Sequence, residues 1–152
     1  MRRTALLLAA VLALAACGGD DGGGDTEFVT EVNAVCADYE PRLELIPPPA
    51  EAIDEWAAIG ADLADLLEAS VNELRLLEPP EALSDGFADW LALRAEMGAA
   101  MRDVQTAGGL HDRAGVEAGL ERVETAIAEA DPLAKELGFA DCSTGIRTAA
   151  PA

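Results

Sequence analysis

The sequence predicts an all-α protein, and more specifically an antiparallel up-down-up-down four-helix bundle, from three observations. Apolar residues recur at steps of three and four in four separate segments, which is the period of one helix face. Clusters of proline or glycine separate the segments, and none of the segments alternates apolar and polar residues as a half-buried strand does. The connections are short, so consecutive helices are expected to run antiparallel.

The four apolar faces are opposed by faces rich in Asp and Glu, as expected for amphipathic helices. The first two faces comprise Phe28, Val32, Val35, Tyr39 and Leu43, and then Ile53, Trp56, Gly60, Leu63, Leu67, Val71, Leu74 and Leu77. The other two comprise Leu83, Phe87, Trp90, Met97, Met101 and Val104, and then Val116, Leu120, Val123, Ile127, Ala130, Ala134 and Leu137.

The boundaries between the helices follow from residues that disfavour helical geometry. Pro47-Pro48-Pro49 and Pro79-Pro80 separate the first three helices, because a proline disfavours helical geometry in the residue before it. Gly108-Gly109 ends the third helix, and Asp112 is expected to cap the start of the fourth. Gly138 is expected to cap the end of the fourth helix in the manner of a C-terminal glycine.

Two prolines fall inside the predicted helices. Pro41 is expected to kink or shorten the first helix, since proline lacks a backbone donor and clashes with the preceding turn. Pro132 is expected to kink the fourth helix without dividing it, because the apolar face keeps its phase beyond that residue.

The N-terminus has the layout of a secretory signal. Arg2 and Arg3 precede an uncharged apolar run, residues 5–16, which is too short to cross a bilayer as a helix. Leu14-Ala15-Ala16-Cys17 looks like a bacterial lipobox, which implies that Cys17 is lipidated and that the chain is cut before it. The alternatives are an ordinary secretory signal peptide and a buried apolar helix with an incidental cysteine.

The chain therefore divides into four parts. Residues 1–16 are expected to be the signal peptide, and residues 17–25 the lipidated cysteine with a flexible Gly/Asp tether. Residues 26–142 are expected to form the bundle, and residues 143–152 a disordered tail.

The charge balance restricts the possible partners. The chain carries 10 basic and 29 acidic residues, a net charge of −19, and loss of Arg2 and Arg3 with the signal lowers this to −21. A nucleic-acid partner is excluded, because phosphate binding needs a basic surface. Contact with the membrane is expected to run through the lipid, and small cations, basic peptides and basic protein surfaces fit as ligands.

Two cysteines remain after Cys17 is assigned to the lipid. Cys36 and Cys142 are expected to form a disulfide, because thiols outside the cytoplasm are usually oxidised and the start of the first helix lies beside the end of the fourth in this topology. Two unpaired buried thiols are the alternative. A zinc site is disfavoured, since such sites need three or four Cys or His ligands and the chain has one His.

No motif indicates catalysis. His111, the one histidine, lies in the Gly-rich turn between the last two helices, where solvent exposure is expected. No Glu-x-x-His motif of a di-iron bundle and no nucleophile-elbow motif is present.

Several further patterns have a simple explanation in this composition. The carboxylates of Asp62, Asp65 and Glu68 share a helix face, but in so acidic a chain such pairs arise by chance and do not indicate a glycosidase. Gly115-x-x-x-Gly119 matches a membrane dimer motif, yet it lies in a charged segment.

Sulfur and aromatic side chains are expected in the core. Met97 and Met101 could bind copper(I) with His111, but their position on the apolar face favours packing. Trp56 and Trp90 are expected to anchor the core, and Gly60 is expected to let an indole approach closely.

Together these features resemble a loose group of small lipoproteins from high-GC Gram-positive bacteria. The resemblance rests on Cys17, the tether over residues 18–25, Val35-Cys36-Ala37, the Leu-Glu-Pro-Pro break over residues 77–80, and the terminal Leu-Gly-Phe-Ala-Asp-Cys over residues 137–142. It implies a helical protein with one cysteine bridge and no assigned activity. No functional residue is transferred beyond the three cysteines.

We therefore expect a monomeric lipoprotein anchored to the outer face of the cytoplasmic membrane, without a cofactor. Its expected role is that of a non-catalytic binding or accessory module, which engages an envelope protein or a small cationic ligand. The alternative is a metal-handling protein or a hydrolytic enzyme that uses His111 and carboxylates.

Overall fold

The computed structural model describes residues 21–47 and 52–142, which form four α-helices and one short 3-10 helix. These are α1 (Asp21–Glu44), α2 (Glu55–Leu74), α3 (Glu81–Gly109), α4 (Arg113–Leu137) and η1 (Ala140–Cys142). No strand occurs in this part of the chain, so the prediction of an all-α protein with four helices is confirmed. The predicted signal peptide, Cys17 and the predicted tail over residues 143–152 lie outside the described residues.

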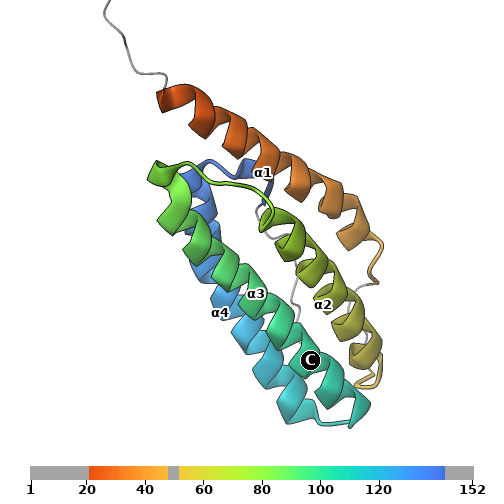
Figure 1. The fold of residues 1–152 in the computed structure, drawn as a ribbon. Coiled ribbons are helices and arrows are strands. Elements are labelled where there is room, and N and C mark those ends of the chain that lie inside the picture. The colour runs from red at the N-terminus through yellow and green to blue at the C-terminus, as the bar shows by residue number, and fades with distance from the viewer. Residues whose placement is uncertain (1–20, 48–51, 143–152) are drawn as a thin grey trace, which may run out of the picture.

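Helix α3 is the centre of the packing. It packs along both α2 and α4, whereas α1 lies against α2 and against η1 (Figure 1). None of the described helices combines the length and the apolar character that a membrane crossing requires.

The predicted apolar faces form the core. Every residue of the four faces is buried or half-buried. Ile53 and Leu77 pack against the core from just outside the ends of α2, so the second helix is shorter than its apolar pattern. The packing of these faces stabilises the helices more than intrinsic propensity does.

The start of α1 differs from the sequence prediction. Residues 21–25 were expected to belong to the flexible tether, but α1 begins at Asp21 and includes them. Each residue added to an existing helix gains one hydrogen bond. A nucleus stabilised by burial of Phe28 and Val32 therefore extends toward the N-terminus, through glycines that would not start a helix.

The predicted caps of α4 are confirmed. The side chain of Asp112 accepts a hydrogen bond from the backbone N–H of Gly115 at 3.1 Å. Gly138 adopts the left-handed conformation with φ 82°. The N–H of Phe139 then donates to the carbonyl of Ala134 at 2.8 Å, which is the bonding pattern of a Schellman motif.

Both internal prolines are accommodated inside helices. Pro132 lies within α4, which is not divided, as predicted. Pro41 also lies within its helix, and α1 ends at Glu44, one turn later.

An aromatic cluster joins α1 to the rest of the molecule. The ring of Phe28 meets the ring of Phe87 on α3 edge to face, with the centroids 4.9 Å apart. Phe139, which follows α4, lies 5.0 Å from the ring of Trp90 and 6.2 Å from the ring of Phe28. Farther along α1, the hydroxyl of Tyr39 donates to Glu73 on α2 at 3.0 Å.

Helices α2 and α3 approach each other through glycines. A Cβ atom on Gly60 would lie 2.6 Å from the backbone nitrogen of Gln105, and one on Gly108 would lie 2.6 Å from the backbone nitrogen of Ala57. Gly60 was expected to make room for an indole. It makes room for the backbone of α3 instead, because the two helix axes are too close for any side chain at that contact.

Glycine also sets the contact between α3 and α4. A Cβ atom on Gly119 would lie 2.5 Å from Cγ2 of Val104, and one on Gly115 would lie 2.8 Å from Cβ of Ala107. The Gly115-x-x-x-Gly119 pattern therefore has a role within the chain, since it allows close packing between two helices of the same bundle.

The close approach at Gly60 predicts the effect of adding one methyl group. The Gly60→Ala variant gains helix propensity, but it forces α2 away from α3, so we expect a net loss of about 1–2 kcal/mol of folding free energy. Urea unfolding would measure this loss. Gly109→Ala is the matched control, since a Cβ there meets nothing within 4 Å, and its stability should be unchanged or slightly higher. Equal effects of the two variants would contradict the close approach.

Candidate functional site

The predicted pair of cysteines forms a disulfide. The sulfur atoms of Cys36 and Cys142 are 2.01 Å apart and their Cα atoms 5.1 Å apart, which joins α1 to η1. Both side chains are buried. Asn33 supports the same junction, because its amide donates to the carbonyl of Gly138 at 3.1 Å and accepts from the N–H of Asp141 at 3.0 Å.

The residues considered for metal chemistry do not assemble. Met97 and Met101 are fully buried in the core, whereas His111 is exposed in the turn after α3, with φ 57°. Within residues 21–47 and 52–142, no group of three or more His, Cys, Asp or Glu side chains could hold a metal ion. The two methionines therefore pack as predicted.

A buried cation that was not predicted from the sequence, Arg94, lies on α3. Its side chain is 7% exposed, and its Nη2 donates to the hydroxyl of Ser70 on α2 at 3.3 Å. Its guanidinium carbon lies 5.1 Å from the centroid of the Trp90 ring, in a cation–π contact. Burial lowers the pKa of Arg94 to about 10, while the charge of Asp131 on α4 acts in the opposite direction. The group is therefore charged at neutral pH.

A gap in the apolar pattern could have indicated this residue. The third apolar face passes from Trp90 to Met97, and the intermediate position at helical spacing is Arg94. On α2, the partner Ser70 lies beside Val71, which belongs to the predicted face. Single-helix patterns do not show that these two polar positions lie opposite each other.

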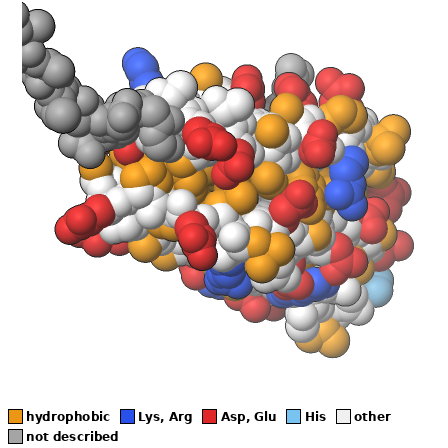
Figure 2. Space-filling model, turned by 45° about the horizontal axis from the view of Figure 1, so that its top comes forward, with side chains coloured by type: hydrophobic (Ala, Val, Ile, Leu, Met, Phe, Trp, Pro, Cys, Tyr) orange, Lys and Arg blue, Asp and Glu red, His pale blue; other side chains and the backbone are white. Residues whose placement is uncertain are grey.

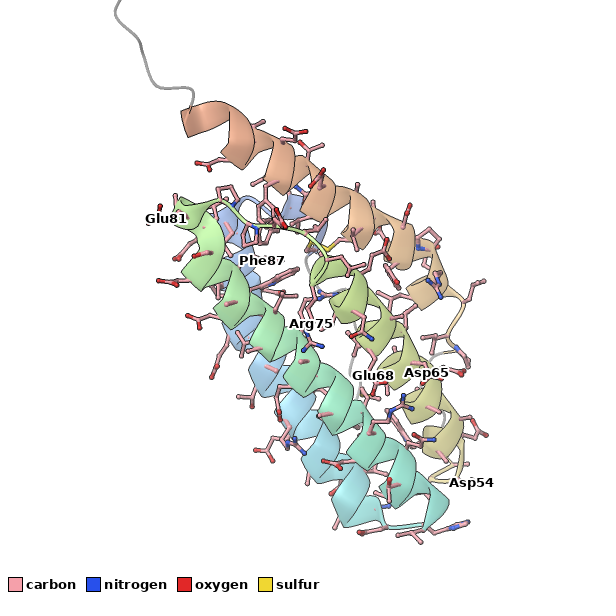
Figure 3. The ribbon with its side chains drawn as sticks, viewed as in Figure 1. Asp54, Asp65, Glu68, Arg75, Glu81 and Phe87 are labelled. Atoms are coloured by element: carbon pink, nitrogen blue, oxygen red, sulfur yellow. A yellow bond between two sulfur atoms is a disulfide. The ribbon has the colours of Figure 1, made fainter. Side chains whose placement is uncertain are left out.

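A second arginine connects α2 and α3 at the surface. Arg102 on α3 binds Glu68 at 2.9 Å and also binds Asp65. These two carboxylates lie on successive turns of α2 (Figure 3). The hydrogen bond from Arg102 lowers the pKa of Glu68. Two of the three carboxylates that were attributed to chance, Asp65 and Glu68, thus have a structural role at this interface.

A third arginine connects α3 and α4. Arg122 on α4 binds Glu96 and Asp103 on α3. Beside it lies a shallow groove with a volume of about 320 Å³, whose lining combines apolar residues with three glutamates. The lining residues are Leu93, Glu96, Glu121, Arg122, Thr125, Ala126 and Glu129.

The surface around these features is acidic. Figure 2 shows Asp and Glu side chains spread over one face, with Lys and Arg at a few places and apolar side chains in a band between them. The described carboxylates can attract cations by charge. Among the described residues, His111 is exposed in its turn while Ser70 is buried against Arg94, so these two are not placed as a base and a nucleophile.

Comparisons of the chain with protein-family models, with curated proteins and with solved structures found no match.

Removal of the disulfide is expected to destabilise the protein strongly. The bond closes a loop with a sequence separation of 106 residues. Its loss in the Cys36→Ala/Cys142→Ala variant should therefore cost about 2–5 kcal/mol. Urea unfolding of the oxidised protein and the variant would measure this cost. Reduced wild-type protein should unfold at a urea concentration close to that of the variant. Identical midpoints for all three samples would contradict the stabilising role of the disulfide.

The contact with Arg102 predicts a pH effect at Glu68. The lowered pKa means that the contact stabilises the fold at neutral pH, and that this stabilisation is lost as the pH falls through the lowered pKa. In the Arg102→Gln variant, the pKa of Glu68 should rise, as measured by NMR titration of its carboxyl carbon. Arg122→Gln is the control, since Arg122 binds Glu96 and Asp103 instead. A rise of the Glu68 pKa in both variants would contradict the assignment.

Proposed function

We propose that this protein is a lipoprotein of the cell envelope, held on the outer face of the cytoplasmic membrane by lipid on Cys17. The observation that carries the proposal is the pairing of the cysteines. Of the three cysteines, two are joined in a disulfide, and the third is Cys17 in the lipobox-like Leu14-Ala15-Ala16-Cys17. A disulfide is typical of a protein outside the cytoplasm.

We propose further that the four helices form an antiparallel up-down-up-down bundle that acts as a monomer. Two features support this topology. The described connections α2–α3 and α3–α4 are short, at residues 75–80 and 110–112. The disulfide joins Cys36 in α1 to Cys142 in η1, as expected when the C-terminal end of α4 lies close to α1.

The proposed role of the bundle is non-catalytic binding of a small cation or a basic segment of an envelope protein. The groove beside Arg122 supports this role, because its lining combines the apolar side chains of Leu93 and Ala126 with the carboxylates of Glu121 and Glu129. Such a lining suits an amine with an aliphatic chain. The net charge of −19 favours cationic ligands over nucleic acid. No described feature favours the metal-handling or hydrolytic alternative.

The anchor and the bridge can be tested together by intact mass. We expect protein purified from membranes to begin at Cys17 with a lipid adduct, and to gain two alkylated thiols only after reduction. The Cys17→Ser variant is the matched control and should lose the lipid while it keeps the disulfide. Wild-type protein without lipid would overturn the proposed anchoring, whatever the state of the other cysteines.

The proposed groove can be tested with tetralysine as a probe. We expect binding at low salt, measured by titration calorimetry, to weaken about 5- to 10-fold in the Glu121→Gln/Glu129→Gln variant. Glu31→Gln/Glu40→Gln on α1 is the control, since it removes the same charge elsewhere. Equal weakening in both variants would show that tetralysine senses only the net charge.

A further inference from the structure

Among the described residues, Arg94 is the one charged residue whose side chain is buried. It occupies a position on α3 whose neighbours on the same face, Trp90 and Met97, are fully enclosed in the core. The Nε atom of Arg94 is buried and has no hydrogen-bond partner within the described chain. A buried charge with an incomplete set of partners destabilises a fold relative to an apolar side chain of similar size. Stability alone therefore does not explain an arginine at this position.

The contacts of Arg94 depend on how α2 is aligned with α3. The acceptor for Nη2 is the hydroxyl of Ser70, which itself donates to the carbonyl of Leu67 at 2.8 Å. A shift of α2 by one turn, about 5.4 Å, would bring Leu66 or Leu74 to this level. Both are buried apolar residues, so the guanidinium would lose its acceptor. Loss of the partner of a buried charge is strongly destabilising.

The compensating charge on α4 also depends on how that helix is aligned with α3. Asp131 lies close enough for its charge to act on the guanidinium of Arg94. A shift of α4 by one turn would replace it by Ile127, which supplies no charge, or by Lys135, which repels a cation. Correct alignment of both neighbouring helices is thus needed for the charge to be compensated.

We propose that Arg94 specifies the register of the bundle, because its hydrogen bond with Ser70 and the nearby charge of Asp131 penalise a one-turn shift of α2 or α4 along α3. This role is independent of the proposed binding function. The glycines at the helix contacts are the competing explanation, since they also favour one alignment through sterics.

The test is the Arg94→Met variant, which keeps an unbranched apolar stem and removes the charge. We expect its Tm to be unchanged or up to about 10 °C higher. We also expect the indole N–H groups of Trp56 and Trp90 each to give more than one NMR signal, because several registers become populated. A single sharp signal for each indole, at whatever position, would overturn the proposal and assign the register to the glycines. A variant that melts lower or does not fold would also overturn it, since Arg94 would then be a stabilising residue.

Two further variants separate register from packing. Arg94→Lys keeps a cation near Ser70 and should restore one signal for each indole, at a lower Tm than that of Arg94→Met. Arg102→Met makes the same substitution at the exposed contact between α2 and α3, and it should leave one signal for each indole. Multiple signals in Arg102→Met would contradict a specific role for the buried charge.

Discussion

The close approach of α3 to both α2 and α4 is the constraint on which the rest of the structure depends. At Gly60 and Gly119 the neighbouring helix occupies the space that a side chain would need. The helix faces between these contacts are accordingly lined by small residues such as Ala64, Ala100 and Ala126. Three phenylalanines and Trp90 form an aromatic cluster where α1, α3 and the residues after α4 meet.

Helix α1 is held by a different set of interactions. It has no close glycine contact with its neighbour among the described positions, and it is attached by the disulfide, by Asn33 and by the ring of Phe28. The covalent bond restricts the unfolded chain, whereas the aromatic cluster removes apolar area from water. Covalent and hydrophobic attachment therefore act together where α1 meets η1 and the residues that follow α4.

Three arginines join helices in different surroundings, and the surroundings determine what each one does. Arg102 and Arg122 bind carboxylates at partly exposed interfaces, where water and salt weaken the attraction. Arg94 is enclosed, so its hydrogen bond with Ser70 matters more for alignment than for net stability. The remaining carboxylates give the surface an excess of negative charge, on which the proposed binding of cationic ligands rests (Figure 2).

The sequence by itself determined the four helices, their buried faces and the caps at Asp112 and Gly138, because apolar period and helix breakers are properties of the chain alone. It predicted the disulfide pair only once Cys17 was assigned to the lipid. It could not show the start of α1 at Asp21, since packing farther along the helix extends it into glycines of low propensity. Only the tertiary structure decided which residues lie at the same level on different helices. The backbone contact at Gly60 and the position of Ser70 opposite Arg94 both depend on the register between helices. The apolar pattern of a single helix does not contain that register.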